Sequence, residues 1–175
     1  MTRIGVLSDT HGLLDPRIFE HFKDMDEVWH AGDIGSLDVL LKLREFKPLR
    51  AVRGNADFGD VQYLLRDVEA FRVENVDVLL THIGYRSGML MPNIQRIVNS
   101  YPKSGVAGSQ DTPTRLFVCG HSHILKVQYD HIHQMLCMNP GAAGKYGIHT
   151  VQTLLRFAID GSQISDLEVI ELQKK

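Results

Sequence analysis

The sequence predicts an α/β fold in which two mixed β-sheets pack face to face as a sandwich and helices flank them. Its first half alternates short apolar runs with helical patterns in the order β-α-β-α-β, which implies parallel strands joined by crossover helices. Its last third consists of strand-like runs separated by turns, which are sufficient for a second sheet. A chain of 175 residues can bury one full core, so we expect a single domain over residues 1–175.

The elements of the first half follow from the spacing of apolar residues. Short apolar runs that end in polar turns predict buried strands at residues 4–7, 27–30 and 49–52. Helical spacing predicts one helix over residues 16–23, with Pro16 near its start. A second helix is capped by Ser36, and its apolar face carries Leu37, Leu40, Leu41 and Leu43.

The second half is rich in strands, apart from one long excursion. Residues 70–73 and 76–80 predict a hairpin, and further strands are expected at residues 115–119, 125–129, 134–138, 150–158 and 164–171. Asp160-Gly161 indicates a hairpin turn between the last two. Residues 83–113 are rich in Gly, Ser, Pro and Asn, with a helix near 93–99, and such loops often shape a substrate site. Within this loop Tyr85, Arg86, Met89 and Met91 either line that site or fill the core.

Composition argues against several classes of protein. The formal net charge of -2 gives no electrostatic reason to expect long nucleic acid or an anionic membrane as a partner. No apolar run reaches the length that spans a bilayer, and the N-terminus lacks the pattern of a secretory signal. We therefore expect a cytoplasmic protein in which Cys119 and Cys137 are reduced core residues.

Five short polar segments each follow a predicted strand and carry the residues that point to chemistry. Because the carboxyl ends of parallel strands meet at one edge of a sheet, these segments are expected to converge. Together they supply oxygen and nitrogen ligands suited to divalent metals, and two such ions could be held. The candidate ligands are Asp9, His11, Asp33, Asn55, His82, His121 and His123.

The order of these segments resembles the calcineurin-like metallophosphoesterase family. The shared motifs are D-x-H, G-D, G-N, H and G-H-x-H, followed here by Asn139-Pro140-Gly141, and the compact length is most similar to the YfcE-like phosphodiesterases. The resemblance implies the four-layer α-β-β-α fold. It also implies that Asp9, His11 and His123 hold a first metal, that Asn55, His82 and His121 hold a second, and that Asp33 bridges them. Manganese is the metal we expect from the resemblance; the donor set also suits iron, zinc, cobalt or nickel.

The function implied by the resemblance is hydrolysis of small phosphate esters, diesters rather than monoesters, by a metal-bridging hydroxide. Asp33, Asn55 and His82 are the expected catalytic residues, and Asn55 and Arg53 are expected to bind the substrate phosphate. For Arg53 a surface ion pair is an equally good interpretation. Asp57 either orients the ligand loop or caps a turn.

One position departs from the family pattern. Ala56 stands where much of the family has a histidine associated with transition-state stabilisation or protonation of the leaving group. Esters with good leaving groups should therefore be cleaved far better than alkyl esters. An alternative function is a weakly active or non-catalytic metal-binding scaffold for protein partners, as in a retromer subunit of the same fold; a nuclease is a third, and a homo-oligomer is possible.

The remaining histidines are weaker candidates. His30 is expected either to support the site or to be a hydrogen-bonded core residue. His131 and His133 lie at a predicted hairpin tip, and His21 lies on a solvated helix face. His149 follows a glycine-rich loop, residues 141–147, which either approaches the site or is purely structural.

Overall fold

The computed structural model describes residues 1–100, 113–147 and 151–173, which form two five-stranded sheets, a small two-stranded sheet and four helices. The first sheet has the spatial order β12 (Gln163–Gln173), β11 (Val151–Asp160), β1 (Thr2–Leu7), β2 (Glu27–His30) and β3 (Leu49–Ala51). The second has the order β4 (Val68–Val73), β5 (Val76–Thr81), β8 (Thr114–Val118), β10 (Met135–Pro140) and β9 (Leu125–Asp130). The small sheet pairs β6 (Tyr85–Arg86) with β7 (Met89–Leu90).

Each large sheet contains three parallel strands at its centre or along one side. β1, β2 and β3 are parallel in the first sheet, and β5, β8 and β10 are parallel in the second. β11 joins the first sheet antiparallel to β1 and pairs with β12 in a hairpin, as Asp160-Gly161 predicted. The carboxyl ends of six parallel strands are therefore available to build a site.

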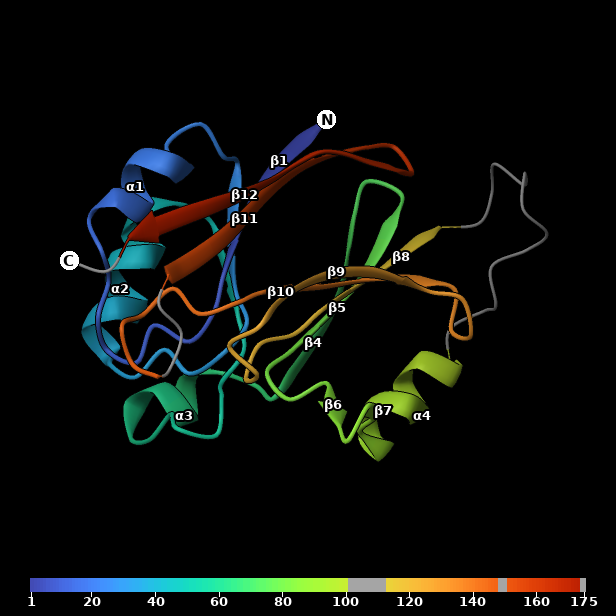
Figure 1. Ribbon diagram of the computed structural model, residues 1–175, viewed down its shortest axis with the longest axis horizontal. Coiled ribbons are helices and arrows are strands. Elements are labelled where there is room, and N and C mark those ends of the chain that lie inside the picture. Colours follow the sequence, from blue (N-terminus) through green and yellow to red (C-terminus); the bar gives the residue numbers. More distant parts are fainter. Residues whose placement is uncertain (101–112, 148–150, 174–175) are drawn as a thin grey trace.

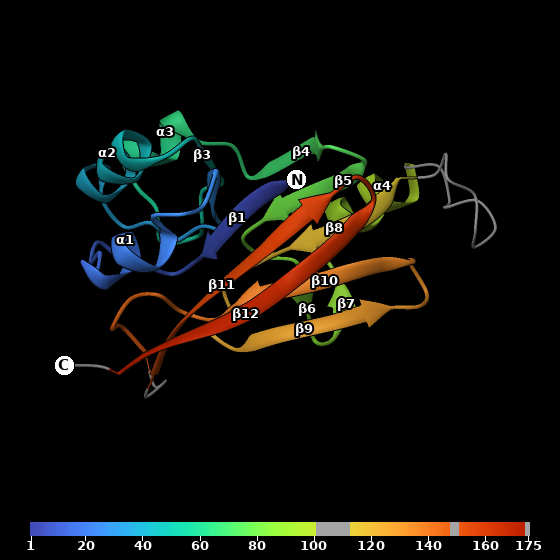
Figure 2. The ribbon, with the colours of Figure 1, turned by 90° about the horizontal axis from the view of Figure 1, so that it is seen from above.

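Helices cover the outer faces of both sheets. Figures 1 and 2 show α1 (Arg17–Phe22), α2 (Leu37–Phe46) and α3 (Asp60–Leu64) on one side, with α4 (Pro92–Ser100) on the opposite side. Three apolar clusters hold these layers together. Leu40 of α2 packs on the first sheet, Trp29 and Val78 meet between the sheets, and Ile94 of α4 packs on the second. The predicted α-β-β-α order of layers is confirmed.

The structure contains elements that the sequence did not reveal. α3 is five residues long, begins after Gly59 without a side-chain cap, and buries Val61 only. β6 and β7 are two residues each and lie inside the loop that follows His82. These elements are too short to show a period, and tertiary contacts stabilise them. The predicted helix near residues 93–99 is confirmed as α4, and the hairpin of β4 and β5 turns at Glu74-Asn75.

Candidate metal centre

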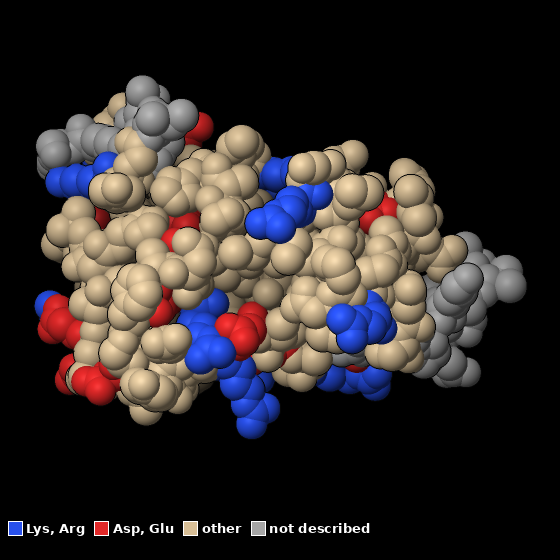
Figure 3. All heavy atoms as spheres, turned by 90° about the horizontal axis from the view of Figure 1, so that it is seen from below, with Lys and Arg blue, Asp and Glu red and all other residues tan. Residues whose placement is uncertain are grey.

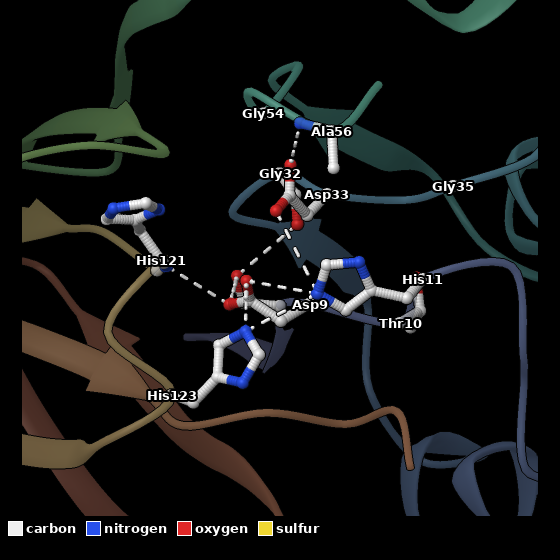
Figure 4. Close-up of polar contacts among 12 residues, drawn as sticks. Asp9, Thr10, His11, Gly32, Asp33, Gly35, Gly54, Ala56, His121 and His123 are labelled. Carbon is white, nitrogen blue, oxygen red and sulfur yellow. Dashed lines mark hydrogen bonds and ion pairs between the residues drawn. The ribbon is translucent and has the colours of Figure 1, made fainter. Parts of the chain in front are cut away.

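The predicted ligand segments converge at the carboxyl ends of the parallel strands. Asp9 and His11 follow β1, Asp33 follows β2, and His82 follows β5. His121 and His123 follow β8, and Asn139 at the end of β10 donates a side-chain hydrogen bond of 2.9 Å to the carbonyl of Gly120. Figure 4 shows side chains of both sheets pointing toward a common centre near Asp9 and Asp33.

A first group of candidate ligands combines Asp9, His11 and His123. The ligand atoms of these three residues lie within 4.8 Å of one another. His123 Nε2 is 3.1 Å from Asp9 Oδ1, and the Nε2 atoms of His11 and His123 are 3.4 Å apart. This group is the ligand set that the family resemblance gave for the first metal.

A second group combines Asp9, Asp33 and His82, all of which are buried. Asp33 Oδ2 lies 3.2 Å from His82 Nε2 and 3.8 Å from His11 Nε2. Asp33 thus lies near one histidine of each group. Asp9 supplies an atom to both groups, a sharing that the sequence did not indicate.

Unpaired polar atoms identify this centre as a site for a cation. Within the described residues, three buried side-chain atoms make no hydrogen bond of acceptable geometry. Two of them are Asp9 Oδ1 and His82 Nε2, which instead face His123 Nε2 at 3.1 Å and Asp33 Oδ2 at 3.2 Å. These two atoms are 3.9 Å apart. An unsatisfied buried polar atom costs about 1–3 kcal/mol, so two of them side by side need a compensating ligand. A divalent ion, which accepts both a carboxylate oxygen and an imidazole lone pair, fits them.

Hydrogen bonds fix which atoms of these side chains face the centre. His82 Nδ1 donates to the carbonyl of Ala31 at 2.7 Å, which leaves Nε2 with its lone pair toward the carboxylates. Asp9 Oδ2 accepts from Ser8 Oγ at 2.6 Å and from the His121 backbone N–H at 3.1 Å, so Oδ1 remains for a ligand. Asp33 Oδ1 accepts from the Ala56 backbone N–H at 2.8 Å, which leaves Oδ2.

The backbone at the site adopts conformations that most residues avoid. Asp9, His11, Asp33, His121 and His123 all have positive φ, between 48° and 70°. A left-handed conformation costs a non-glycine residue about 1–2 kcal/mol. Five such residues, all just after the carboxyl ends of β1, β2 and β8, indicate a functional site at these strand ends.

Close approach of the backbone explains why glycine follows the strand at two of these turns. A Cβ on Gly54 would fall on Asp33 Oδ1, and one on Gly120 would fall on Ser8 Oγ. Gly32 is similarly confined, since a Cβ there would fall on the side chain of His82.

Asp57 connects the loops after β2 and β3. Its buried carboxylate accepts backbone N–H bonds from Gly35 at 2.7 Å, Gly54 at 2.8 Å and Ile34 at 3.2 Å. Both interpretations of Asp57 therefore hold, because it closes its own turn and also positions the loop that carries Asp33.

His30 is a buried structural residue. Its Nδ1 accepts from the Gly32 N–H at 3.2 Å, so Nε2 carries the proton and donates to Thr10 Oγ1 at 2.9 Å. Burial lowers its pKa to about 3, so the ring is neutral. It ties the segment after β1 to the segment after β2 and has no direct contact with the candidate ligand atoms among its hydrogen bonds.

Electrostatics at the centre favours the charged form of Asp33. Burial alone would raise the pKa of Asp33, but the neighbouring His82 and the Ala56 N–H outweigh burial and lower it. Burial alone would lower the pKa of His82, and the carboxylates of Asp33 and Asp9 outweigh it in turn. The centre thus attracts positive charge, whether a proton or a metal ion.

His121 belongs to neither group, and Asn55 offers an amide oxygen rather than a carboxylate or imidazole. Both are exposed, and the His121 ring packs edge-on against His82 with centroids 5.2 Å apart. Figure 4 shows that ring turned away from His11 and His123. Asn55 lines a cavity of about 240 Å³ together with His82.

Arg53 lines the same cavity, but its guanidinium is engaged elsewhere. It makes two bonds to the Asp67 carboxylate, at 2.6 and 2.9 Å, and a third to the carbonyl of Gln62 at 2.8 Å. The surface ion pair, which was one of the two interpretations of Arg53, is therefore present, with Asp67 as the partner. Arg53 also lines the cavity in which a substrate phosphate was expected.

The predictions for His131 and for the two cysteines are confirmed, whereas His133 and His21 are less exposed than expected. His131 is exposed at the β9–β10 turn, whereas His133 is half-buried against Asp130 at 2.7 Å. His21 is half-buried rather than fully solvated, because Arg156 packs on its carbonyl. Cys119 and Cys137 are unpaired and buried, and burial raises the pKa of Cys119 to about 12. His149 lies outside the described residues.

The sequence analysis missed several supporting residues. Ser8 orients Asp9, and its only sequence signal is its place beside that aspartate. The glycine-rich loop does approach the centre, since Gly144 N–H donates to the Asp9 carbonyl at 3.0 Å. From the same loop, Tyr146 places its ring 5.3 Å from that of His11.

Comparison with known proteins identifies the family. The model of the calcineurin-like phosphoesterase superfamily domain matches residues 2–162. The chain belongs to this superfamily. A probable metallophosphoesterase of Methanothermobacter thermautotrophicus is 28% identical over 176 residues, covering 95% of this chain and 91% of the relative.

Two of the solved structures that share the fold are a Vps29 and a phosphoesterase. A Vps29 from Entamoeba histolytica superposes with a TM-score of 0.70 at 14% identity, covering 99% of each chain. The phosphoesterase Yfce from E. coli superposes with a TM-score of 0.56 at 19% identity, covering 95% of this chain and 98% of its own. The predicted family and the predicted four-layer architecture are both confirmed.

Proposed function

We propose that this calcineurin-like phosphoesterase is a dinuclear metal-dependent phosphodiesterase that acts on small substrates. The observation that carries the proposal is the pair of unpaired buried atoms, Asp9 Oδ1 and His82 Nε2, at the junction of two groups of ligands. A purely structural centre would satisfy these atoms with hydrogen bonds from the protein.

Two divalent ions fit the donor set. Asp9, His11 and His123 would hold the first, and His82, His121 and Asn55 would complete the second, with Asp33 between them. His121 and Asn55 lie at the exposed side of His82, so their side chains would turn inward to bind. Manganese is our first choice, with iron, zinc, cobalt and nickel as alternatives, and one Vps29 structure is described as a zinc complex.

Bound metals would supply an activated water and neutralise the charge of the phosphate oxygens. The chain itself supplies position. Ser8 and the Ala31 carbonyl hold Asp9 and His82 in fixed orientations, and Asp57 holds the loop of Asp33. Asn55, which lines the cavity beside His82, would donate its amide to a phosphate oxygen. Arg53 could join it only by leaving Asp67.

Two cavities beside the centre favour a diester over a monoester. One, lined by Asn55 and His82, and another, lined by His121, each have a volume of about 240 Å³. His82 lines the first and His121 lines the second, and the two rings contact each other edge-on. A phosphodiester has two ester groups to place on either side of its phosphorus atom, and a monoester has one.

The surface of the molecule supports a small substrate. Figure 3 views the side on which α3 and α4 lie in Figure 1, where basic side chains lie in separate places with acidic ones between them. Long nucleic acid needs a continuous basic track, which this face lacks among the described residues. No described helix is long and apolar enough to cross a membrane.

The test is hydrolysis of bis(p-nitrophenyl) phosphate with added Mn²⁺. The wild-type protein should release p-nitrophenol well above the metal-only blank, and Asp33→Ala should abolish the release. Asp38→Ala, which removes an exposed carboxylate on α2, is the matched control and should retain the rate. A rate that survives Asp33→Ala would contradict the proposal.

A protein-binding scaffold is the second candidate, because the fold of Vps29 covers the whole described chain. It predicts metal binding without hydrolysis. Full metal occupancy together with no rate above the blank would favour the scaffold.

A further inference from the structure

The cavity beside His121 has a composition that restricts what it can hold. Its volume of about 240 Å³ is below the ~300 Å³ of sites that enclose a whole small ligand, so it suits one group of a larger molecule. Its lining combines apolar and aromatic side chains with one cation, and includes Tyr85, Cys119, His121, Ile124, Lys126 and Asn139. We call it the Tyr85 pocket.

The tyrosine wall of the Tyr85 pocket is fixed in place. The half-buried Tyr85 donates its hydroxyl to Cys137 Sγ at 3.2 Å, and its ring packs edge-on against Phe117 with centroids 5.7 Å apart. Both cysteines of the lining are buried and free. A rigid aromatic face beside apolar sulfur atoms favours a flat, apolar group of the ligand.

The charge of the Tyr85 pocket comes from Lys126. Lys126 is an exposed residue of the lining, and its Nζ lies over the Tyr85 ring, 5.6 Å from the ring centroid. Within the described residues the lining contains no aspartate or glutamate. A flat group in this pocket therefore gains an attraction if it carries a negative charge at its outer end.

The Tyr85 pocket also adjoins the metal centre. His121 lines it, and the ring of His121 contacts that of His82. An ester group attached to a phosphate at the centre can thus enter the pocket directly. The other cavity, which His82 itself lines, has no tyrosine, phenylalanine or tryptophan among its described lining residues.

We propose that the Tyr85 pocket selects one ester group of the substrate, namely an aryl or nucleoside group that carries an additional phosphate. The ring of Tyr85 contacts the flat face of the ester group, and Lys126 binds the added phosphate by charge attraction. This inference rests on the proposed phosphodiesterase function, since it places the scissile phosphate at the metal centre, but its test does not need turnover.

The test compares two ligands that resemble a cleaved substrate, thymidine 5′-monophosphate and thymidine 3′,5′-bisphosphate. Their binding to the full chain is measured by calorimetry at a fixed concentration of Mn²⁺. The bisphosphate should bind about three- to tenfold more tightly to the wild-type protein, as expected for a partly exposed ion pair. Lys126→Met should remove this preference and leave the affinity for the monophosphate unchanged.

Two variants serve as controls. Lys126→Arg keeps the charge and should keep the preference. Lys42→Met removes the same charge from α2, where Lys42 pairs with Asp38 at 2.7 Å, and should also keep it. Equal affinity of the wild-type protein for both ligands, failure to bind either, or a preference that survives Lys126→Met would overturn the proposal.

Turnover is scored separately, with the p-nitrophenyl esters of the same two nucleotides. Binding that depends on Lys126 without any hydrolysis would reject the phosphodiesterase function and retain the pocket. Hydrolysis of both esters at the same rate, in the wild-type protein and in Lys126→Met alike, would support the phosphodiesterase function and reject the role of the Tyr85 pocket.

Discussion

Replacing Asp57 with asparagine should show how much the hydrogen bonds that hold the loops contribute to metal binding, because Asp57 is not itself a candidate ligand. The buried carboxylate accepts three backbone N–H bonds, from Ile34, Gly35 and Gly54. Asparagine has one oxygen instead of two, so its amide group must face at least one of these N–H groups. Hydrogen bonds to a charged acceptor contribute about 1.5–3 kcal/mol each, and the remaining bonds weaken once the charge is gone. We expect a loss of about 2–4 kcal/mol in the free energy of unfolding.

The same substitution should weaken metal binding although Asp57 is not itself a candidate ligand. Two of its donors flank the loops of Asp33 and Asn55, and loss of such supporting bonds typically lowers metal affinity by about 10- to 100-fold. Urea denaturation of the metal-free protein gives the stability, and calorimetric titration with Mn²⁺ gives the affinity.

Asp60→Asn is the matched control for Asp57→Asn. Asp60 is exposed in the first turn of α3, so its removal should cost under about 1 kcal/mol and leave metal affinity unchanged. If the two variants showed the same stability and the same affinity for Mn²⁺, the reasoning from the Asp57 hydrogen bonds would be refuted.

Three further predictions concern metal, leaving group and pH. Mn²⁺ at about 100 times its dissociation constant should stabilise the protein by about 2.7 kcal/mol, a rise of roughly 5–10 °C in Tm by calorimetry, and Asp9→Asn should remove most of that rise. Because Ala56 offers only its backbone N–H, rates for a series of aryl phosphodiesters should fall steeply as the pKa of the leaving group rises; a flat series would point to another proton donor. The Arg17 side chain lowers the pKa of Asp15 to about 2, which is below the value in the unfolded chain. The ionised Asp15 carboxylate therefore stabilises the folded protein above pH 4, and this contribution is lost as the pH falls toward 2. The stability difference between wild type and Asp15→Asn, followed by urea denaturation, should therefore shrink from pH 5 to pH 2, and a constant difference would contradict the assignment.

Much of the fold could be predicted because its signals are local. The runs at residues 4–7 and 27–30 and the turn at Asp160-Gly161 each show in a few neighbouring residues, and the structure confirms them as β1, β2 and the β11–β12 hairpin. The five-residue helix α3 was not predictable, because it has no side-chain cap and buries a single residue. Its formation depends on contacts with residues distant in the sequence.

The sequence by itself determined which residue types stand at the strand ends, because each ligand segment follows its strand within a few positions. The motif resemblance also gave the first group of ligands, Asp9, His11 and His123, but the tertiary structure decided the other contacts. Asp9 enters both groups of ligands, Arg53 pairs with Asp67, and Lys126 and Tyr85 share a pocket, although each of these pairings joins separate elements. Such distances depend on how two sheets pack and on where loops turn. Spacing along the chain carries no information on them, because side chains from β1, β2, β5 and β8 meet only when both sheets are assembled.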